Sequence, residues 1–394
     1  MPPQTSKPII NKHVASLSPS ATLAITAKAK QLKSQGVDVI NFAGGEPDFD
    51  TPQLFKDAAI KALKEGMTRY TPTTGLPALK DAIIEKLKRD NQLEYKADQI
   101  IVTVGAKHAV FNAIQVLVDE GDEVLIPAPY WLSYPEMVKM AGGRNVIIST
   151  LESQRFKLTP ELLKRSITPA SKVLILNSPS NPTGVVYTKE ELTELTRIAV
   201  ERGIFVVSDE IYEKLIYGKT RHHAVAGLDP KFKDWVITVN GLSKAYAMTG
   251  WRLGYLAAPV EIAKAASNLQ DHQTSNVTSF AQPAAIEALR NGEAEAKKLC
   301  EIFSKRRDLI VSELRKISQI SFVEPDGAFY VFVNITKTGL NSLEFSQRIL
   351  DEIHIALIPG APFGAEGFVR ISFATSEQEI VKGAERLRLW VQKK

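Results

Sequence analysis

Lys244 and Asp209 are the two residues whose types and places in the sequence point most directly to chemistry. Lys244 follows the apolar run 235–240 (WVITVN) and lies among small and apolar residues, where burial can lower the pKa of a lysine and make its amine a usable nucleophile or base. Asp209 ends the apolar run 204–208 (IFVVS), and a carboxylate there is costly unless a cation or a strong hydrogen-bond donor pairs with it. The ordinary alternatives are a surface cation for Lys244 and a helix N-cap for Asp209.

Three further residues occupy similar positions after apolar runs. Gly105, in VTVGAKH, permits a tight turn into a helix, and the free N–H groups of a helix N-terminus suit a phosphate. Asn181, in NSPSNPTG, precedes Pro182, which keeps the Asn181 backbone out of helical angles, so that its amide can point across the strand ends. Arg252 follows Lys244 by eight residues. Taken one at a time, these residues are explained at least as well by ordinary turns and a surface cation.

The combination of these groups predicts a cofactor. A lysine that can form a Schiff base, a buried carboxylate, a phosphate-binding helix end and an arginine together match pyridoxal phosphate, which takes a lysine at its aldehyde and an acid at its pyridinium nitrogen. Signatures of other chemistry are missing from the sequence, which holds no G-x-G-x-x-G after a strand, no P-loop, no G-x-S-x-G and no H-E-x-x-H. We interpret the adjacent His222 and His223 as a surface loop pair and expect no metal site.

The elements that must position these residues alternate along the middle of the chain. Short runs rich in Val, Ile and Leu are typical of strands buried on both faces, and they occur at Ile100–Val104, Glu123–Pro127, Lys172–Asn177, Ile204–Ser208, Trp235–Asn240 and Gly254–Ala257. Helical segments lie between them. Thr51 as N-cap, with Pro52 at the first helical position, predicts the start of one helix, and Thr188 predicts the start of another. This alternation predicts the α/β class, with a mostly parallel sheet covered by helices.

The pattern changes near residue 291, where a smaller α+β domain is predicted. A long helix from Glu293 to Lys316 is followed by a strand at Phe329–Val333, a helix at Ser342–Ile353, a strand at Val369–Phe373 and a last amphipathic helix. We expect a large domain over residues 47–292, and a small domain made of residues 1–46 and 293–394.

Composition excludes several classes of protein. The 49 Lys and Arg against 44 Asp and Glu give a net charge of only +5 and no basic stripe, so we expect no nucleic-acid partner. Cys300 is the only cysteine, which excludes an intrachain disulfide. No stretch has the length of a membrane helix, and the first twenty residues hold no signal-peptide core. We expect a cytoplasmic protein without a membrane partner.

Eight motifs follow one another in the order and spacing of one enzyme family. They are AGGEPDFDTP, TRYTPTTG, PAPYWLSYPEM, NSPSNPTG, VSDEIYE, SKAYAMTGWRLGY, PDGAFY and VRISFATS, and they cover nearly the whole chain. The sequence resembles the class I, pyridoxal-phosphate-dependent aminotransferases of fold type I, and most of all the bacterial and plastid type of aspartate aminotransferase, of which some members also act on prephenate. The resemblance implies a large domain with a mostly parallel, seven-stranded sheet between helices, and a smaller α+β domain.

The resemblance also implies a role for each residue near the cofactor. Lys244 would form the Schiff base with pyridoxal 5′-phosphate and then move the proton at the substrate α-carbon, while Asp209 would keep the pyridine nitrogen protonated. Asn181 and Tyr212 would bind the phenolic oxygen, and Trp131 would stack on the ring; Trp131 and Asn181 would also border the substrate. The phosphate would be bound by Gly105, Ala106, Lys107, Ser243, Arg252 and, from the partner subunit of a homodimer with shared active sites, by Tyr70.

The substrate would be held by a second group of residues. Arg370 would bind the α-carboxylate as a bidentate fork, a geometry that lysine lacks, and Gly45 would offer its backbone. Lys107 is the candidate for the distal carboxylate, although it could simply add positive charge near the phosphate. Thr22 matches a threonine that accompanies prephenate use. We expect ping-pong transfer from L-aspartate to 2-oxoglutarate, giving oxaloacetate and L-glutamate; the alternatives are an aspartate/prephenate enzyme or an aromatic or alanine-type aminotransferase.

Overall fold

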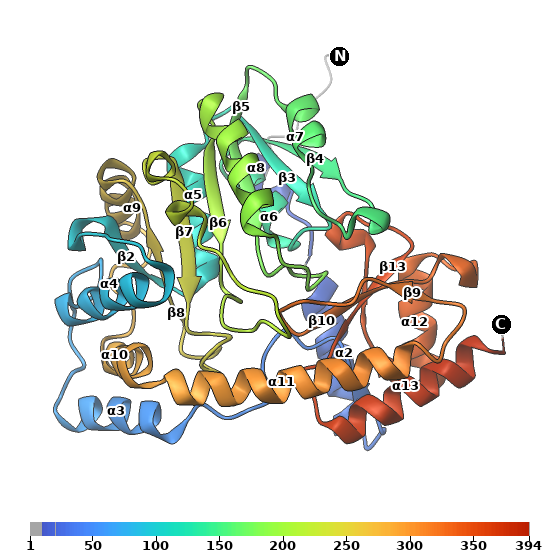
Figure 1. The fold of residues 1–394 in the computed structure, drawn as a ribbon. Coiled ribbons are helices and arrows are strands. Elements are labelled where there is room, and N and C mark those ends of the chain that lie inside the picture. Colours follow the sequence, from blue (N-terminus) through green and yellow to red (C-terminus); the bar gives the residue numbers. More distant parts are fainter. Residues whose placement is uncertain (1–9, 20, 394) are drawn as a thin grey trace, which may run out of the picture.

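A seven-stranded sheet forms the centre of the molecule (Figure 1). The computed structural model describes residues 10–19 and 21–393. The strands are ordered β2-β8-β7-β6-β5-β3-β4, and only β8 runs antiparallel to its neighbours, so the predicted mostly parallel α/β sheet is confirmed. The bounds are β2 Ile100–Val104, β3 Glu123–Ala128, β4 Arg144–Ser149, β5 Ser171–Asn177, β6 Phe205–Asp209, β7 Val236–Gly241 and β8 Leu253–Ala257.

The edge strand β4 is the strand that the apolar runs did not predict. It pairs only with β3, and most of its residues are exposed or half-buried. The strands in the middle of the sheet are buried along nearly their whole length, because helices cover both of their faces. A strand at the edge needs no continuous apolar run, so its sequence carries a weaker signal.

Helices cover the two faces of the sheet and bury two apolar layers. On one face, Ile101, Ile126 and Val207 lie in a cluster with apolar residues of α5, α6 and α9. On the other face, Leu125, Leu174 and others pack with residues of the remaining helices of this region. The bounds are α3 Gln53–Lys64, α4 Pro77–Asn91, α5 Ala106–Leu117, α6 Ser133–Met140, α7 Pro160–Ser166, α8 Lys189–Glu201, α9 Val260–Asp271 and α10 Gln282–Asn291.

The two predicted helix starts had different outcomes. Thr188 caps α8 in a capping box: its side chain accepts from the Glu191 N–H, and the Glu191 carboxylate accepts from the Thr188 N–H. The prediction that Thr51 caps α3 is wrong, since Pro52 is the N-cap and makes no side-chain cap bond. The Thr51 hydroxyl donates instead to the Ala247 carbonyl at 2.6 Å, because a tertiary partner competes for the hydroxyl.

The C-terminal part of the chain builds a second sheet, ordered β12-β13-β10-β9. Its bounds are β9 Ser321–Phe322, β10 Tyr330–Asn334, β12 Ile358–Pro359 and β13 Phe368–Ser372, with helices α11 Glu293–Leu314, α12 Ser342–Ile353 and α13 Glu377–Val391. The predicted helix over 342–353 is confirmed. Figure 1 shows α11 running along the molecule from the seven-stranded sheet to this second sheet.

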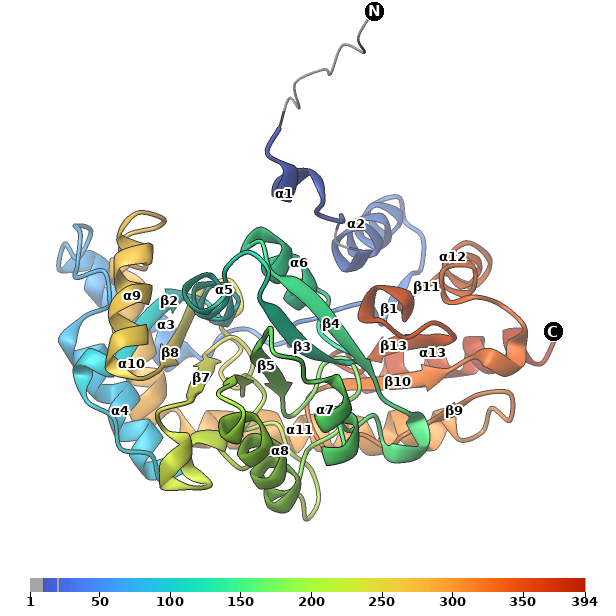
Figure 2. The same ribbon diagram turned by 90° about the horizontal axis from the view of Figure 1, so that it is seen from above.

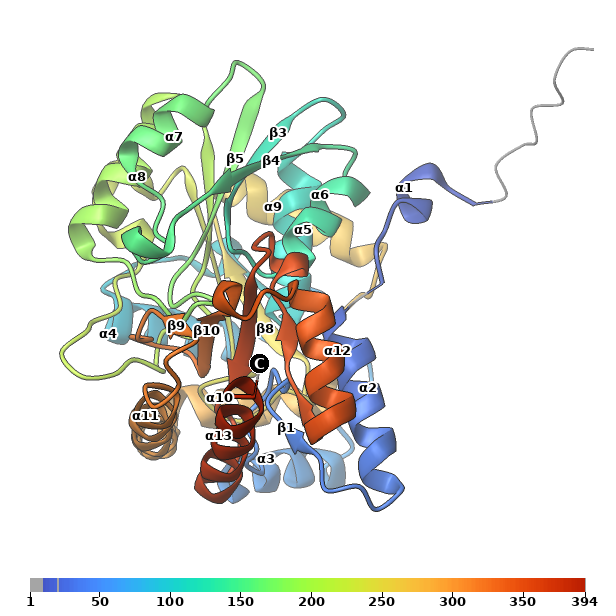
Figure 3. The same ribbon diagram turned by 90° about the vertical axis from the view of Figure 1, so that its right-hand side faces the viewer.

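An N-terminal segment joins this C-terminal part although it is distant in sequence. β1 (Ile40–Asn41) pairs in parallel with β11 (Ile355–Ala356). α2 (Ala21–Ser34) lies beside α12, as Figure 3 shows. The short helix α1 (Lys12–Ala15) lies at the margin of the molecule in Figures 2 and 3, where it contacts α6 and Lys12 pairs with Glu120 at 3.6 Å.

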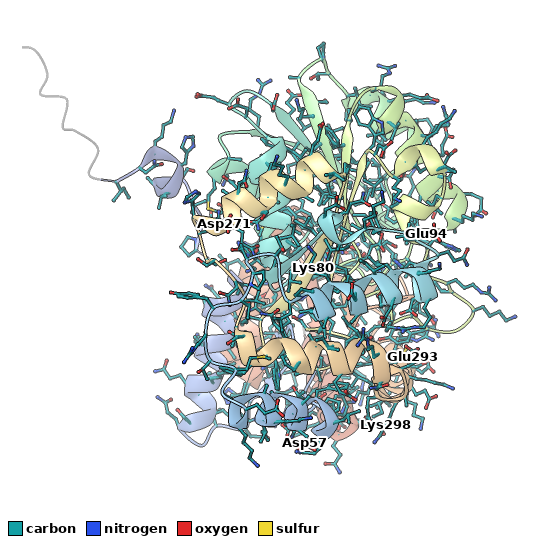
Figure 4. The ribbon with its side chains drawn as sticks, turned by 90° about the vertical axis from the view of Figure 1, so that its left-hand side faces the viewer. Asp57, Lys80, Glu94, Asp271, Glu293 and Lys298 are labelled. Atoms are coloured by element: carbon teal, nitrogen blue, oxygen red, sulfur yellow. The ribbon has the colours of Figure 1, made fainter. Side chains whose placement is uncertain are left out.

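The surface carries both signs of charge. Figure 4 shows acidic and basic side chains on one face, with Asp57 on α3, Lys80 on α4, Asp271 at the end of α9, and Glu293 and Lys298 on α11. Among the described helices, none combines the length and the apolar character that a membrane span requires.

Candidate active site

A cavity of about 430 Å³ opens where several strands of the large sheet end. The carboxyl ends of β2, β3, β5, β6 and β7 each lead into a segment that lines it, as expected for an α/β sheet. Residues from the second sheet and the N-terminal segment close its other side. Eleven of the predicted site residues line this one cavity: Gly45, Ala106, Lys107, Trp131, Asn181, Asp209, Tyr212, Ser243, Lys244, Arg252 and Arg370.

The charges of the lining residues favour an anionic ligand. Four basic side chains line the cavity, those of Lys107, Lys244, Arg252 and Arg370, against the single carboxylate of Asp209. A cavity with that excess of positive charge attracts phosphate and carboxylate groups.

The N-terminus of α5 meets the Arg252 guanidinium on one side of the cavity. Gly105 is the N-cap of α5 with φ +78°, and a Cβ there would lie 2.7 Å from Arg252 Nη2, so only glycine allows the contact. Gly254 permits a second close approach, since its Cβ would lie 2.3 Å from the Ala106 nitrogen. Arg252 Nη1 donates to the Thr249 carbonyl at 2.8 Å. Backbone N–H groups at the helix start and a fixed guanidinium form a suitable phosphate site.

Lys244 reaches the cavity with its amine held by a neutral acceptor. Its Nζ donates to the Gly45 carbonyl at 2.6 Å and lies 5.9 Å from the centre of the Tyr212 ring. Burial lowers the pKa of Lys244, the positive charge of Arg370 lowers it further, and the result is a pKa of about 8. The lowered pKa supports the expectation that the Lys244 amine can act as a nucleophile or base.

Asp209 is buried, and its partner is a phenol. The Tyr134 hydroxyl donates to Asp209 Oδ2 at 2.6 Å, and the Ile211 N–H lies 3.3 Å from Oδ1. Burial raises the pKa of Asp209 to about 6, while the Tyr134 hydrogen bond opposes the rise. The strong donor that the sequence required is thus Tyr134, which the sequence analysis missed; its only sequence signal is its place three residues after Trp131.

Two hydrogen-bond acceptors hold the guanidinium group of Arg370 in place. It lies on β13 and is 2% exposed. Nη1 donates to Asn181 Oδ1 at 3.0 Å and Nη2 donates to the Ala43 carbonyl at 2.9 Å. Its Nε is buried and has no acceptor among the described residues. Both of these partners are neutral acceptors, and Arg370 has no carboxylate partner among the described residues, so its guanidinium can bind the carboxylate of a ligand.

Lys107 and Trp131 form the remaining wall. Lys107 Nζ lies 5.0 Å from the centre of the Trp131 ring, within the range of a cation–π contact. Burial lowers the pKa of Lys107, and the charge of Arg252 lowers it further. Trp131 also packs edge-to-face against Tyr134, with ring centres 5.3 Å apart.

Two predicted residues, Gly105 and Tyr70, do not line the cavity. Gly105 borders it through its contact with Arg252. Tyr70 is 92% exposed and lies outside it. Thr22 lies in the first turn of α2, where the side chains of residues 21–23 are outside the described part of the structure. Tyr330, which lines the cavity, was not predicted as a site residue, although it ends the motif PDGAFY.

The prediction that His222 belongs to a surface loop pair is wrong. Its side chain is 8% exposed, and its Nε2 lies 3.0 Å from Glu210 Oε2. His222, Glu210 and Glu213 have ligand-type atoms within 4.8 Å of one another. The Lys86 ammonium already pairs with Glu213 and supplies the positive charge of this cluster.

Comparison with known proteins identifies the family. The family model described as aminotransferase class I and II matches residues 37–387. The chain is 50% identical to the aspartate aminotransferase of Geobacillus stearothermophilus, over 97% of this chain and 98% of the relative. It is 45% identical to the probable aspartate/prephenate aminotransferase of Aquifex aeolicus, over 95% and 96%. The chain belongs to the class I and II aminotransferases.

A solved structure extends this comparison to the fold. The aspartate aminotransferase from Thermus thermophilus with maleate superposes with a TM-score of 0.94 at 43% identity, and the match covers 97% of this chain and all of that one. The architecture is therefore that of the fold type I aminotransferases, as the sequence resemblance implied.

The residues in the cavity fit pyridoxal phosphate, the cofactor of aspartate-type class I aminotransferases. A Cβ at Gly105 would fill the cradle formed by α5 and Arg252, so this glycine leaves room at the helix N-terminus. Lys244 offers an amine for the aldehyde of the cofactor, and its pKa is lowered to about 8. Asp209 offers a buried carboxylate for the pyridinium nitrogen. This protein is thus a pyridoxal-phosphate-dependent aminotransferase that acts on amino acids and 2-oxo acids.

Proposed function

We propose that this aminotransferase transfers the amino group of L-aspartate to 2-oxoglutarate in a ping-pong reaction, giving oxaloacetate and L-glutamate. The observation that carries the proposal is the pair of basic groups, Lys107 and Arg370, that line the same cavity as Lys244. A dicarboxylic substrate needs two cationic contacts with the reacting amine between them. The names of the bacterial relatives, aspartate aminotransferase among them, support the same substrate.

Lys244 is the residue that we assign to the reaction itself. When bound, pyridoxal phosphate supplies an aldehyde for the amine and an electron-withdrawing ring. With a pKa near 8, the Lys244 amine is partly unprotonated at neutral pH, so it can take a proton from the substrate α-carbon and return it. Asp209 keeps the pyridine nitrogen protonated, and Tyr134 orients its carboxylate through their 2.6 Å hydrogen bond.

The remaining lining residues hold the two ligands in place. Asn181 and Tyr212 bind the phenolic oxygen, and Trp131 stacks on the ring. Ser243, Arg252 and the N–H groups at Gly105 and Ala106 bind the phosphate. Arg370 binds the α-carboxylate, Gly45 presents its backbone, and Lys107 contacts the distal carboxylate.

We further propose that the enzyme is a cytoplasmic homodimer with shared active sites. Tyr70 is a large side chain that is 92% exposed in the single chain, and it suits a contact with the phosphate in the partner subunit. We infer a large domain over residues 47–292 and a small domain made of the flanking segments. The pairing of β1 with β11 supports this division, and closure of the small domain would exclude water from the cavity.

The first test is an absorbance spectrum of the purified holoenzyme before and after addition of L-aspartate without an oxo acid. Loss of the visible band of the cofactor joined to Lys244, with release of oxaloacetate, supports the proposal. A spectrum that aspartate leaves unchanged but an aromatic donor or L-alanine changes overturns the aspartate assignment. The Lys244→Ala variant is the control, because it lacks the amine that bonds to the cofactor and moves the proton at the substrate α-carbon.

Prephenate is the second candidate substrate. The relative from Aquifex aeolicus and the one from Thermus thermophilus carry aspartate/prephenate aminotransferase in their names. The enzyme is first converted to its amino form with L-aspartate and then mixed with prephenate or 2-oxoglutarate. Return of the visible band with both acceptors identifies a bifunctional enzyme, and return with 2-oxoglutarate alone excludes prephenate.

Lys107 provides the test of dicarboxylate specificity. The Lys107→Ala variant should raise KM for L-aspartate by about 10-fold or more and leave KM for an aromatic donor nearly unchanged, since a lost charged contact costs about 1.5–3 kcal/mol. Lys64→Ala, at the exposed end of α3, is the matched control. An equal effect of Lys107→Ala on every donor would refute the role.

A further inference from the structure

Tyr330 links two groups that have different tasks in the proposed site. It begins β10, is 1% exposed and lines the cavity. Its hydroxyl oxygen lies 2.9 Å from the hydroxyl oxygen of Tyr212, and either atom could donate. Its ring centre lies 4.3 Å from the central carbon of the Arg370 guanidinium. Tyr330 therefore contacts both Tyr212, which we assign to the phenolic oxygen of the cofactor, and Arg370, which we assign to the α-carboxylate of the substrate.

The hydroxyl pair has a preferred direction if Tyr212 serves the phenolic oxygen. A tyrosine hydroxyl has only one proton to donate. If Tyr212 uses its proton toward an anionic oxygen in the cavity, then the hydrogen bond between the two tyrosines must use the proton of Tyr330. Burial raises the pKa of both hydroxyls, and Arg370 opposes the rise at both, so each keeps its proton and can donate.

The Tyr330 ring orients the guanidinium in a way that its polar contacts do not. Asn181 and Ala43 hold the Nη1 and Nη2 atoms of Arg370, which lie in the guanidinium plane. The Tyr330 ring interacts with the positive charge of the same group at 4.3 Å, and the Phe363 ring centre lies at 5.3 Å. An aromatic face attracts a cation without using any of its N–H donors. Tyr330 thus helps to fix Arg370 without occupying any of its N–H donors.

We propose that Tyr330 is a positioning residue with two separable parts: its hydroxyl directs the Tyr212 proton into the cavity, and its ring holds Arg370 for the substrate carboxylate. The inference rests on the proposed function, because that function assigns the tasks of Tyr212 and Arg370. It adds a residue through which the cofactor contact and the substrate contact are joined.

The two parts are tested with two variants of the holoenzyme. Tyr330→Phe removes the hydroxyl and keeps the ring, whereas Tyr330→Leu removes both. The matched controls are Tyr217→Phe, which removes a buried hydroxyl that donates to the Ala328 carbonyl, and Phe345→Leu, which removes a buried ring in the same apolar cluster. Thermal midpoints of all four variants measure any purely structural effect.

The hydroxyl is measured by a pH titration of the visible absorbance of the bound cofactor, which needs no substrate. Tyr330 donates to Tyr212 and so keeps the Tyr212 proton directed at the anionic oxygen. Loss of the Tyr330 hydroxyl weakens that donation, which makes protonation of the cofactor easier and moves the titration midpoint to higher pH. We expect Tyr330→Phe to move the midpoint up by about half to one pH unit, the size of one lost neutral hydrogen bond. Tyr217→Phe should leave the midpoint unchanged.

The ring is measured by the binding of maleate, an unreactive dicarboxylate, and by KM and kcat for L-aspartate. Tyr330→Leu should weaken maleate and raise KM about 3- to 30-fold, the size of one lost cation–π contact, while kcat falls less. Tyr330→Phe should change maleate binding less than about twofold. An unmoved titration midpoint in Tyr330→Phe, or maleate binding in Tyr330→Leu no weaker than in Phe345→Leu, overturns the inference.

The outcome is distinguishable from failure of the proposed function. If wild-type holoenzyme ignores L-aspartate, the aspartate assignment fails, yet the titration still tests the Tyr330 hydroxyl because it needs the cofactor alone. If wild type responds to L-aspartate and the Tyr330 variants match their controls, only the role of Tyr330 fails.

Discussion

Two lysines in this enzyme, the buried Lys86 and the half-buried Lys244, have opposite surroundings. Lys86, on α4, pairs with the Glu213 carboxylate and donates to Asn91 Oδ1 at 2.7 Å. Lys244 donates to a neutral carbonyl, that of Gly45, and has the cation Arg370 among its neighbours. The first arrangement places Lys86 in an ion pair with a carboxylate. In the second, burial and the charge of Arg370 lower the pKa of Lys244 to about 8. The charge of the surrounding groups therefore separates the ion-paired lysine from the lysine that we assign to the reaction.

The largest expected effect in this comparison belongs to Lys244. The Lys244→Ala variant should lose turnover by at least about 10⁴-fold, since acid–base catalysis alone contributes up to that much, while the cofactor still binds weakly. Its free energy of unfolding should stay equal or rise, because a cation without a carboxylate partner is removed from a half-buried position. Half-reaction kinetics and urea unfolding measure the two quantities. Near-normal kcat in this variant would sink the assigned mechanism.

Lys86 should show the reverse pattern. The Lys86→Met variant leaves Glu213 buried without its cation and should lower the free energy of unfolding by about 3–5 kcal/mol, with kcat changed less than about threefold. The double variant Lys86→Met with Glu213→Gln removes both charges and should recover most of that loss. Urea unfolding of the single and double variants forms the cycle. A double variant no more stable than the single one would contradict the pairing argument.

Tyr134 extends the comparison from the two lysines to the buried carboxylate of Asp209, to which its hydroxyl donates. Its hydrogen bond opposes the rise that burial causes in the pKa of Asp209, so the Tyr134→Phe variant should raise that pKa above about 6. The proposed mechanism requires ionised Asp209, and the acidic limb of the kcat/KM profile should therefore move up by about one to two pH units. Tyr217→Phe is the control, and a limb that moves equally in both variants would remove Tyr134 from the role.

The smallest expected effect is the acid stability contributed by Glu213. Burial would raise the pKa of Glu213, but Lys86 and His222 outweigh it and lower the pKa to about 2. The unfolded chain has a pKa of about 4.3 for this group, so its stabilising contribution is present above that pH and is lost as the pH falls toward 2. Unfolding free energies measured from pH 5 downward should fall less steeply in Glu213→Gln than in wild type.

The sequence predicted the fold better at its centre than at its edges. The strands β5, β6 and β7 were found within a residue or two because helices on both faces demand continuous apolar runs. The edge strand β4 lacks such a run and was missed. Thr51 was predicted as a helix cap from local pattern, but its hydroxyl bonds to Ala247, nearly two hundred residues away.

The candidate site divides in the same way. The sequence by itself determined the family, through the order of the motifs, and it predicted the candidate reactive groups, because lysine, aspartate and arginine occupy turns at strand ends. Only the tertiary structure decided how those groups are tuned. The Tyr134 bond to Asp209, the Tyr330 contacts with Tyr212 and Arg370, and the burial of His222 each join segments whose separation along the chain hides the contact. A pKa depends on burial and on charges in space, so the residue type names the chemistry and the folded surroundings set its strength.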